Sequence, residues 1–138
     1  MPTGSPPTRQ IDWDLHNVEH GSHPVSRVTT DVRWPALALT HANIVQLSLL
    51  NDGTVVDIGG GDGGLGYLLG AECKCYINLE PSTVILSRLE SQGATGTVRG
   101  FGEHLPFRPE AFTCVSAKSS LDHAFDLDLM LAESYRVL

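Results

Sequence analysis

The sequence has little positive charge. Nine lysines and arginines stand against sixteen aspartates and glutamates, so the 138 residues carry a formal net charge of −7. Proteins that bind DNA or RNA through phosphate contacts need a basic surplus on the binding face. We therefore expect no nucleic-acid partner.

Long apolar runs are also missing. No stretch reaches about 18 apolar residues, the length that crosses a bilayer. The first residues, Met-Pro-Thr-Gly-Ser-Pro-Pro, lack the basic and apolar regions of a secretory signal. The three cysteines are few and odd in number, which favours a reducing compartment over a disulfide framework. These absences predict a cytoplasmic protein without membrane contact.

The sequence gives no good metal motif either. His16 and His20 have the spacing of two ligands on one helix face, but Gly21 and Pro24 argue against a continuous helix there. We therefore predict no metal site.

What remains is the composition of one globular domain, with 41% hydrophobic and 18% charged residues. Residues 1–33 show little periodicity, and we expect an irregular N-terminal segment that serves as a lid or packs on the core. Residues 34–138 alternate between helical and strand patterns. Such alternation predicts a doubly wound α/β fold, with a parallel sheet covered by helices on both faces.

The expected elements are a helix from Pro35 to about residue 50, a strand at 54–58, a helix at 65–69, a strand at 74–79, a helix at 81–91, strands at 95–99 and 112–117, and a helix at 122–138 capped by Asp122.

A glycine-rich turn follows the first strand, at 57–63. Glycines at this place allow a tight turn and let the backbone approach a ligand. The spacing fits the dinucleotide fingerprint in two registers, one starting at Gly59 and one at Gly61, so alone it does not select one nucleotide, and a merely flexible loop stays open. Asp57 would repel a diphosphate, so it favours a ligand that carries an amine.

A second acid, Glu80, ends the second strand. In a doubly wound sheet this strand lies beside the first, so its carboxylate reaches the same crevice. A carboxylate accepts hydrogen bonds from both hydroxyls of a ribose. The alternative is an acid at a helix N-terminus, stabilised by the helix dipole.

With these motifs the sequence resembles the class I S-adenosylmethionine-dependent methyltransferases, in particular the branch that acts on small molecules. The resemblance covers roughly residues 50–138. It rests on six ordered motifs: the glycine turn at 57–63, the acid Glu80, the loop at 100–107, the strand at 112–115, the segment at 121–123 and the helix end at 133–138.

The resemblance implies that S-adenosylmethionine binds at the carboxyl ends of the strands. Asp57, Gly59 and Gly61 would lie along its methionine part, and Glu80 would hold the ribose. Phe101 would pack on the adenine, and the backbone N–H of Gly102 would contact the same ring. A carbonyl near Lys118 or Ser119 would meet the methionine amine or lie beside the transferring methyl.

Two side chains and the chain's length depart from the family pattern. Phe101 stands where the family has an adenine-binding aspartate, and Thr113 replaces the aspartate of the fourth strand. The family also continues beyond the position of Leu138 into further strands. We therefore expect a partial class I fold with strand order 3-2-1-4. The apolar edge of its fourth strand (Phe112, Cys114 and Val115) invites a second copy or a partner chain.

The predicted function is methyl transfer from S-adenosylmethionine to a small-molecule acceptor, by this chain or with this chain as the cofactor-binding portion. His123 is the proposed base, although it equally fits a packing or orienting role. Two alternatives stay open: a nicotinamide-dependent oxidoreductase, and a non-catalytic relative that binds a partner through the open sheet edge.

Overall fold

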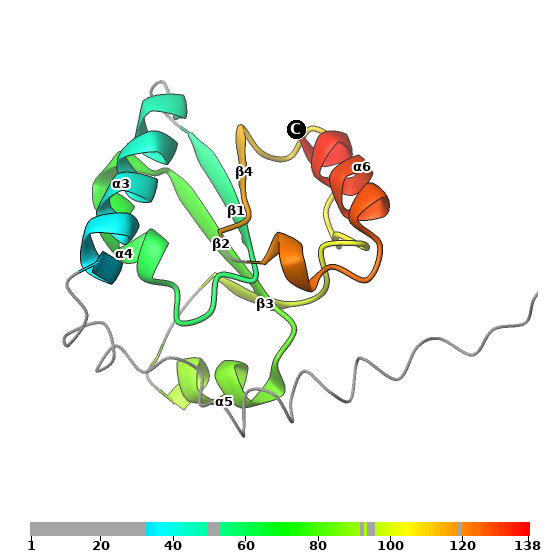
Figure 1. Cartoon of the computed structure of the whole chain (residues 1–138), viewed down its shortest axis with the longest axis horizontal. Coiled ribbons are helices and arrows are strands. Elements are labelled where there is room, and N and C mark those ends of the chain that lie inside the picture. Colours follow the sequence, from blue (N-terminus) through cyan, green and yellow to red (C-terminus); the bar gives the residue numbers. More distant parts are fainter. Residues whose placement is uncertain (1–32, 50–52, 92, 94–95, 119) are drawn as a thin grey trace, which may run out of the picture.

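A parallel sheet forms the centre of the computed structural model, which describes residues 33–49, 53–91, 93, 96–118 and 120–138 (Figure 1). Its four strands are arranged in the order β3-β2-β1-β4, and every neighbouring pair is parallel. The strands are β1 (Thr54–Ile58), β2 (Cys75–Glu80), β3 (Thr97–Arg99) and β4 (Cys114–Ser116). The predicted fold class and the predicted strand order are confirmed.

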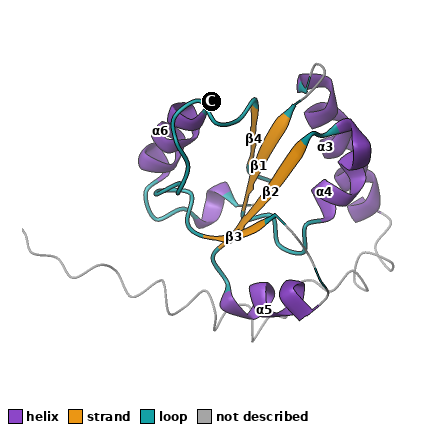
Figure 2. Cartoon of the chain, turned by 180° about the vertical axis from the view of Figure 1, so that it is seen from behind, coloured by secondary structure: helices purple, strands orange, loops and turns teal. Residues whose placement is uncertain are grey.

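Helices cover both faces of this sheet. Helices α3 (Arg33–Ser48) and α4 (Gly64–Leu69) lie on one side, and α6 (Leu127–Val137) lies on the other, as both views show (Figures 1 and 2). Helix α5 (Thr83–Ser91) connects β2 to β3. Two 3-10 turns, η1 (Gly70–Glu72) and η2 (Leu121–His123), complete the described elements. Because each crossover returns to a parallel strand, all carboxyl strand ends meet at one edge of the sheet.

The face toward α6 holds the larger apolar cluster. Val56, Ile58 and Leu79 point to this side because strand side chains alternate between faces. They pack on Met130 and Val137 of α6, and Val56, Leu79 and Val137 are fully buried. This cluster is the main core, since full burial of each such side chain contributes about 1.5–3 kcal/mol.

The opposite face is apolar only at the amino ends of its strands. There Val55 packs with Val45 of α3, with Leu49 just after that helix and with Leu69 of α4. Toward the carboxyl ends the same face becomes polar, with Asp57 of β1 in register with Asn78 of β2 and Ser116 of β4. Every member of this polar row is buried.

The last helix differs from its prediction. We expected one helix over 122–138 with Asp122 as its cap; instead η2 ends at His123, Ala124 is extended, and α6 begins at Leu127. Asp126 is the true cap, because its carboxylate accepts the N–H of Leu129 at 3.0 Å.

A distant carboxylate explains the break. Glu103, buried in the loop after β3, accepts the N–H of Phe125 at 2.6 Å and that of Asp126 at 3.4 Å. Those two donors therefore do not need a preceding helical turn.

Other boundaries shift less. Strand β1 has its predicted bounds, and β2 lies one residue later than expected. Strand β4 is shorter than predicted because Phe112 and Thr113 donate their N–H groups outside its ladder, to Val137 and Thr54.

The lid prediction for 1–33 lies almost wholly outside the described residues. Strand β4 forms an edge of the described sheet, and its pairing with a partner or second copy stays a prediction.

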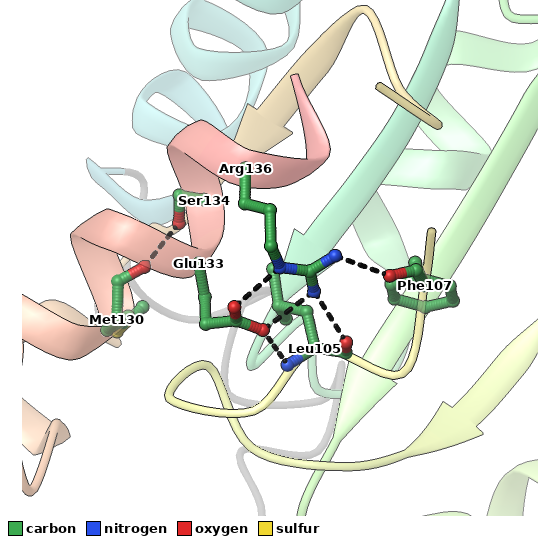
Figure 3. Close-up of polar contacts among 6 residues, drawn as sticks. All are labelled: Leu105, Phe107, Met130, Glu133, Ser134 and Arg136. Atoms are coloured by element: carbon green, nitrogen blue, oxygen red, sulfur yellow. Dashed lines mark hydrogen bonds and ion pairs between the residues drawn. The ribbon is translucent and has the colours of Figure 1, made fainter. Parts of the chain in front are cut away.

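Two residues of α6 hold the loop that follows β3 (Figure 3). Glu133 accepts the N–H of Leu105 at 2.8 Å and binds Arg136 through two bonds of 2.6 and 2.8 Å. Arg136 in turn donates to the carbonyls of Phe107 and Leu105, at 2.8 and 3.0 Å. The helix end and the loop were separate motifs in the sequence, and this cluster joins them.

The Glu133 bonds predict a pH-dependent stability. Mainly the Arg136 hydrogen bond lowers the pKa of Glu133 from 4.5 to about 2. A lowered pKa in the folded state means that Glu133 stabilises the fold above pH 4.5 and loses this effect as the pH falls toward 2. We expect Glu133→Gln to reduce the free energy of unfolding by about 1–3 kcal/mol at neutral pH.

Urea denaturation at several pH values measures this effect. The deficit of Glu133→Gln should shrink as the pH falls below 4.5. Glu90→Gln is the matched control, because it removes the same charge from an exposed position on α5 and should cost little. A deficit of constant size across this pH range would contradict the role of the ionised carboxylate.

Candidate functional site

The glycine turn after β1 uses left-handed backbone three times. Gly59, Gly61 and Gly63 have φ values of 68°, 59° and 79°. Residues with a Cβ rarely adopt such values, so glycine is needed at these positions for conformation. The Gly59 N–H donates to the carbonyl of Leu79 at 2.7 Å, which fixes the start of the turn against β2.

Gly61 lies at the centre of the turn and is held by two residues of β2. Its N–H donates to Oε2 of Glu80 at 3.1 Å, and its carbonyl accepts Nδ2 of Asn78 at 2.8 Å. Among the described residues, a Cβ on Gly61 would meet no atom within 4 Å. The outer side of this residue is therefore open, and a ligand can approach its backbone there.

Gly60 is needed for a different reason, close packing. A Cβ on Gly60 would lie 2.4 Å from Oδ1 of Asn78 and 2.7 Å from Oδ2 of Asp57. Within the described part of the chain, this Asn78 oxygen is buried and has no hydrogen-bond partner. Two acceptor oxygens therefore converge directly beneath the turn.

Asp57 is buried, with only 4% of its surface exposed. Its Oδ2 accepts the hydroxyl of Tyr76 at 2.8 Å, and Ser116 of β4 is its neighbour in register. Burial raises the pKa of Asp57, while the hydroxyls of Tyr76 and Ser116, followed by His41 and Lys118, oppose the rise. The pKa of Tyr76 is raised as well, first by burial and then by the nearby Asp57 charge.

Glu80 is equally buried at the end of β2, with 4% of its surface exposed. Besides Gly61, it accepts the N–H of Ser82 at 2.9 Å through Oε1. The Ser82 hydroxyl in turn accepts the N–H of Ile85 in the first turn of α5, at 3.4 Å. Through these bonds Glu80 ties the glycine turn and the start of α5 to the end of β2.

The loop after β3 places Phe101 and Gly102 differently. Phe101 is half-buried, and its carbonyl accepts the N–H of His104 at 3.1 Å. Gly102 is buried against α6, since a Cβ there would lie 2.8 Å from Met130 and 3.0 Å from Ile58. The glycine thus lets the loop pass close beneath the helix.

The segment after β4 closes over the end of β1. The Ser120 hydroxyl donates to the carbonyl of Ile58 at 2.7 Å, and a Cβ on Gly59 would lie 2.8 Å from the Ser120 Cβ. His123 follows in η2, with its side chain 41% exposed and 3.7 Å from the carboxylate of Asp122. Lys118 is half-buried and close enough to influence the charge of Asp57.

The structure thus joins the predicted residues Gly61 and Glu80 by a direct bond, and Gly59 is bonded to Leu79, next to Glu80. Asp57 lies beneath the same turn. It also adds four side chains that the sequence did not single out: Tyr76, Asn78, Ser116 and His41. Among the described residues, no group of three potential ligands can hold a metal ion. Nor does any described helix have the length and apolarity to cross a membrane.

Comparison with known proteins gives one family match. The model of a family described as "Methyltransferase domain" matches residues 56–138, which begin in β1 and include the turn, both acids and α6. No curated protein matches the sequence.

Solved structures share this fold. A candidate S-adenosylmethionine-dependent methyltransferase of Methanococcus maripaludis matches with a TM-score of 0.69 and 18% identity, over 100% of this chain and 63% of its own. A Thermotoga maritima protein, described as an S-adenosylmethionine-dependent methyltransferase and possible histamine N-methyltransferase, matches with a TM-score of 0.54 and 25% identity, over 80% of this chain and 55% of its own. A Bacillus subtilis protein has a TM-score of 0.60 and 20% identity, over 72% of this chain and 46% of its own. The chain therefore spans between about half and two thirds of the length of these relatives.

The packing beneath the turn predicts the effect of a single methyl group. Gly60→Ala should push apart Asn78 and Asp57, which are held by other bonds, and lower the free energy of unfolding by about 1–3 kcal/mol. Gly64→Ala is the control, because Gly64 opens α4 and its Cβ would meet only the exposed Asp62, at 3.3 Å. That change should be neutral or stabilise by up to about 1 kcal/mol. Urea denaturation compares the two, and equal effects would argue against a close approach at Gly60.

Proposed function

Because this chain belongs to the methyltransferase domain family, of the class I S-adenosylmethionine-dependent type, we propose that it binds S-adenosylmethionine at the glycine turn and transfers its methyl group to a small-molecule acceptor. The observation that carries this proposal is the bond between Glu80 and the Gly61 N–H. It puts a buried carboxylate beside an open stretch of glycine backbone. A nucleoside with a free ribose diol fits both features.

Two further features fit this ligand. The buried Asp57 lies beneath the same turn and offers an acceptor to an ammonium group, as the methionine part of the ligand requires. The Oδ1 of Asn78, which has no hydrogen-bond partner among the described residues, adds a second acceptor close by. A diphosphate would instead place negative charge near two buried carboxylates, which disfavours a dinucleotide.

In this proposal each predicted residue has one role. Gly59 and Gly61 give passage to the methionine part, Asp57 holds its amine through the local network, and Glu80 accepts the ribose hydroxyls. Phe101 packs on the adenine, the Gly102 N–H contacts its ring, and the Lys118 backbone lies near the amine. Gly102 is packed so closely on Met130 that a Cβ at position 102 would lie 2.8 Å from its side chain, which supports a fixed position for this loop.

S-adenosylmethionine, when bound, supplies a methyl group that its sulfonium has already activated. The chain's own residues then orient the two reactants and exclude water, which is the main catalytic contribution that such a transfer needs. His123 is exposed beside the closing segment, so it can take a proton from an acceptor that must lose one. The net charge of −7 favours a small acceptor over a nucleic acid.

Calorimetric titration of the chain tests the cofactor directly. We expect binding of S-adenosylmethionine and no binding of NAD at the same concentrations. The reverse pattern, with NAD bound and S-adenosylmethionine not bound, would refute the proposal and favour an oxidoreductase.

Glu80→Gln tests the ribose role. A hydrogen bond to a charged group is worth about 1.5–3 kcal/mol, so affinity for S-adenosylmethionine should fall by about 10- to 100-fold. The exposed variant Glu90→Gln should bind like the original chain. Thermal unfolding of both variants separates this loss from misfolding, because Glu80 also holds the backbone of Gly61 and Ser82. Unchanged affinity in a folded Glu80→Gln chain would remove the ribose role.

A further inference from the structure

A chain of polar side chains leads from helix α3 to the buried acid of the site. Nε2 of His41, on α3, lies 2.9 Å from Oγ of Ser116 on β4. Ser116 is 3% exposed and in register with Asp57 of β1, so the two side chains are neighbours on one face of the sheet. From the other side, Tyr76 of β2 donates to the same carboxylate at 2.8 Å. Three strands and one helix thus converge on a single acid.

The direction of these bonds follows from counting hydrogens. An ionised carboxylate can only accept, so the Ser116 hydroxyl beside it has its one hydrogen to offer to Asp57. In that arrangement the bond between Ser116 and His41 uses a hydrogen on Nε2, which is the tautomer that we assign to His41. The histidine is therefore the first donor of a relay that ends at Asp57.

The order of this relay excludes a hydrolytic triad. In such triads the histidine stands between the serine and the acid and removes the serine proton. Here the serine stands between the other two, and its oxygen is buried. The relay can orient a carboxylate, but it does not produce a nucleophile.

We propose that His41 is a positioning residue that acts through Ser116 to hold the Asp57 carboxylate in the orientation that binds the amino group of S-adenosylmethionine. This inference rests on the proposed function of the site. His41 precedes the residues matched by the family model, which begin at 56, so it adds to the site from outside that region.

The physical reason is the cost of a buried charge. Tyr76 donates to Asp57 from one side and the Ser116 hydroxyl is its neighbour on the other, and a buried carboxylate that loses a donor turns or takes up a proton. Either change weakens its attraction for an ammonium group. A ligand without the amine would not sense the change.

A pair of thioether ligands isolates this effect. S-adenosylhomocysteine carries the amino acid portion, and 5′-methylthioadenosine shares its adenosyl thioether but lacks that portion. In calorimetric titrations we expect His41→Leu to weaken binding of S-adenosylhomocysteine about tenfold and to leave 5′-methylthioadenosine within about twofold. His41→Gln, which keeps an N–H donor of similar reach, should restore most of the lost affinity.

Two further variants complete the test. Asn43→Ala, at an exposed position of the same helix, should change neither affinity. Ser116→Ala cuts the relay in the sheet and should repeat the selective loss, and adding it to His41→Leu should cost little more because both act through one chain of bonds. Ser116→Ala also provides the test if His41→Leu does not fold.

The outcomes separate the two proposals. If the original chain binds neither ligand, the proposed function fails. If it binds both, and the variants leave both affinities unchanged or lower them equally, the positioning role of His41 fails while the proposed function stands. Selective loss for S-adenosylhomocysteine, with recovery in His41→Gln, supports the role.

Discussion

The N–H of Gly61 donates to the carboxylate of Glu80, and much of the site depends on this bond. It joins the turn after β1 to the end of β2, two points 19 residues apart in sequence. Burying a carboxylate is costly unless donors satisfy it, and Glu80 obtains two from backbone N–H groups, of Gly61 and Ser82. The first needs the left-handed conformation that a glycine provides at 61. The burial of Glu80 therefore depends on the glycine at 61, and the conformation of Gly61 is fixed by its bond to Glu80.

The two faces of the sheet have different roles: one forms the main apolar core, and the other holds the polar residues beneath the glycine turn. The face toward α6 is an apolar core, and its side chains alternate along each strand with the polar row on the other face. Asp57 can be buried beside Val56 and Ile58 because those neighbours point away from it. The motif at the end of α6 serves the core side, since Glu133 and Arg136 fix the loop at 105–107 from below.

Local signals in the sequence predicted the fold well and the site only in part. Strand β1 was predicted with its bounds because an apolar run lies between Gly53 and Gly59. The start of α6 was wrong because both Asp122 and Asp126 suit a helix cap, and a bond from Glu103, 22 residues away, decides between them. Asn78 was missed although a signal existed: Tyr76, Asn78 and Glu80 alternate along β2 and so share the face of Asp57. The contact between His41 and Ser116 has no comparable signal, because it joins positions 75 residues apart.

That long-range contact changes how the N-terminal helix relates to the site. Helix α3 buries Val45 against the amino ends of the strands, as does Leu49 just after it, while His41, one helical turn before Val45, reaches the polar row. Helix α3 therefore both packs on the sheet and hydrogen-bonds to Ser116 through His41. Its apolar contacts determine where His41 lies. Because the side chains of a packed interior interlock, a shift of α3 would move His41 together with Val45 and break the hydrogen bond to Ser116. The orientation of Asp57 is consequently coupled to the packing of a helix that precedes the glycine turn in the chain.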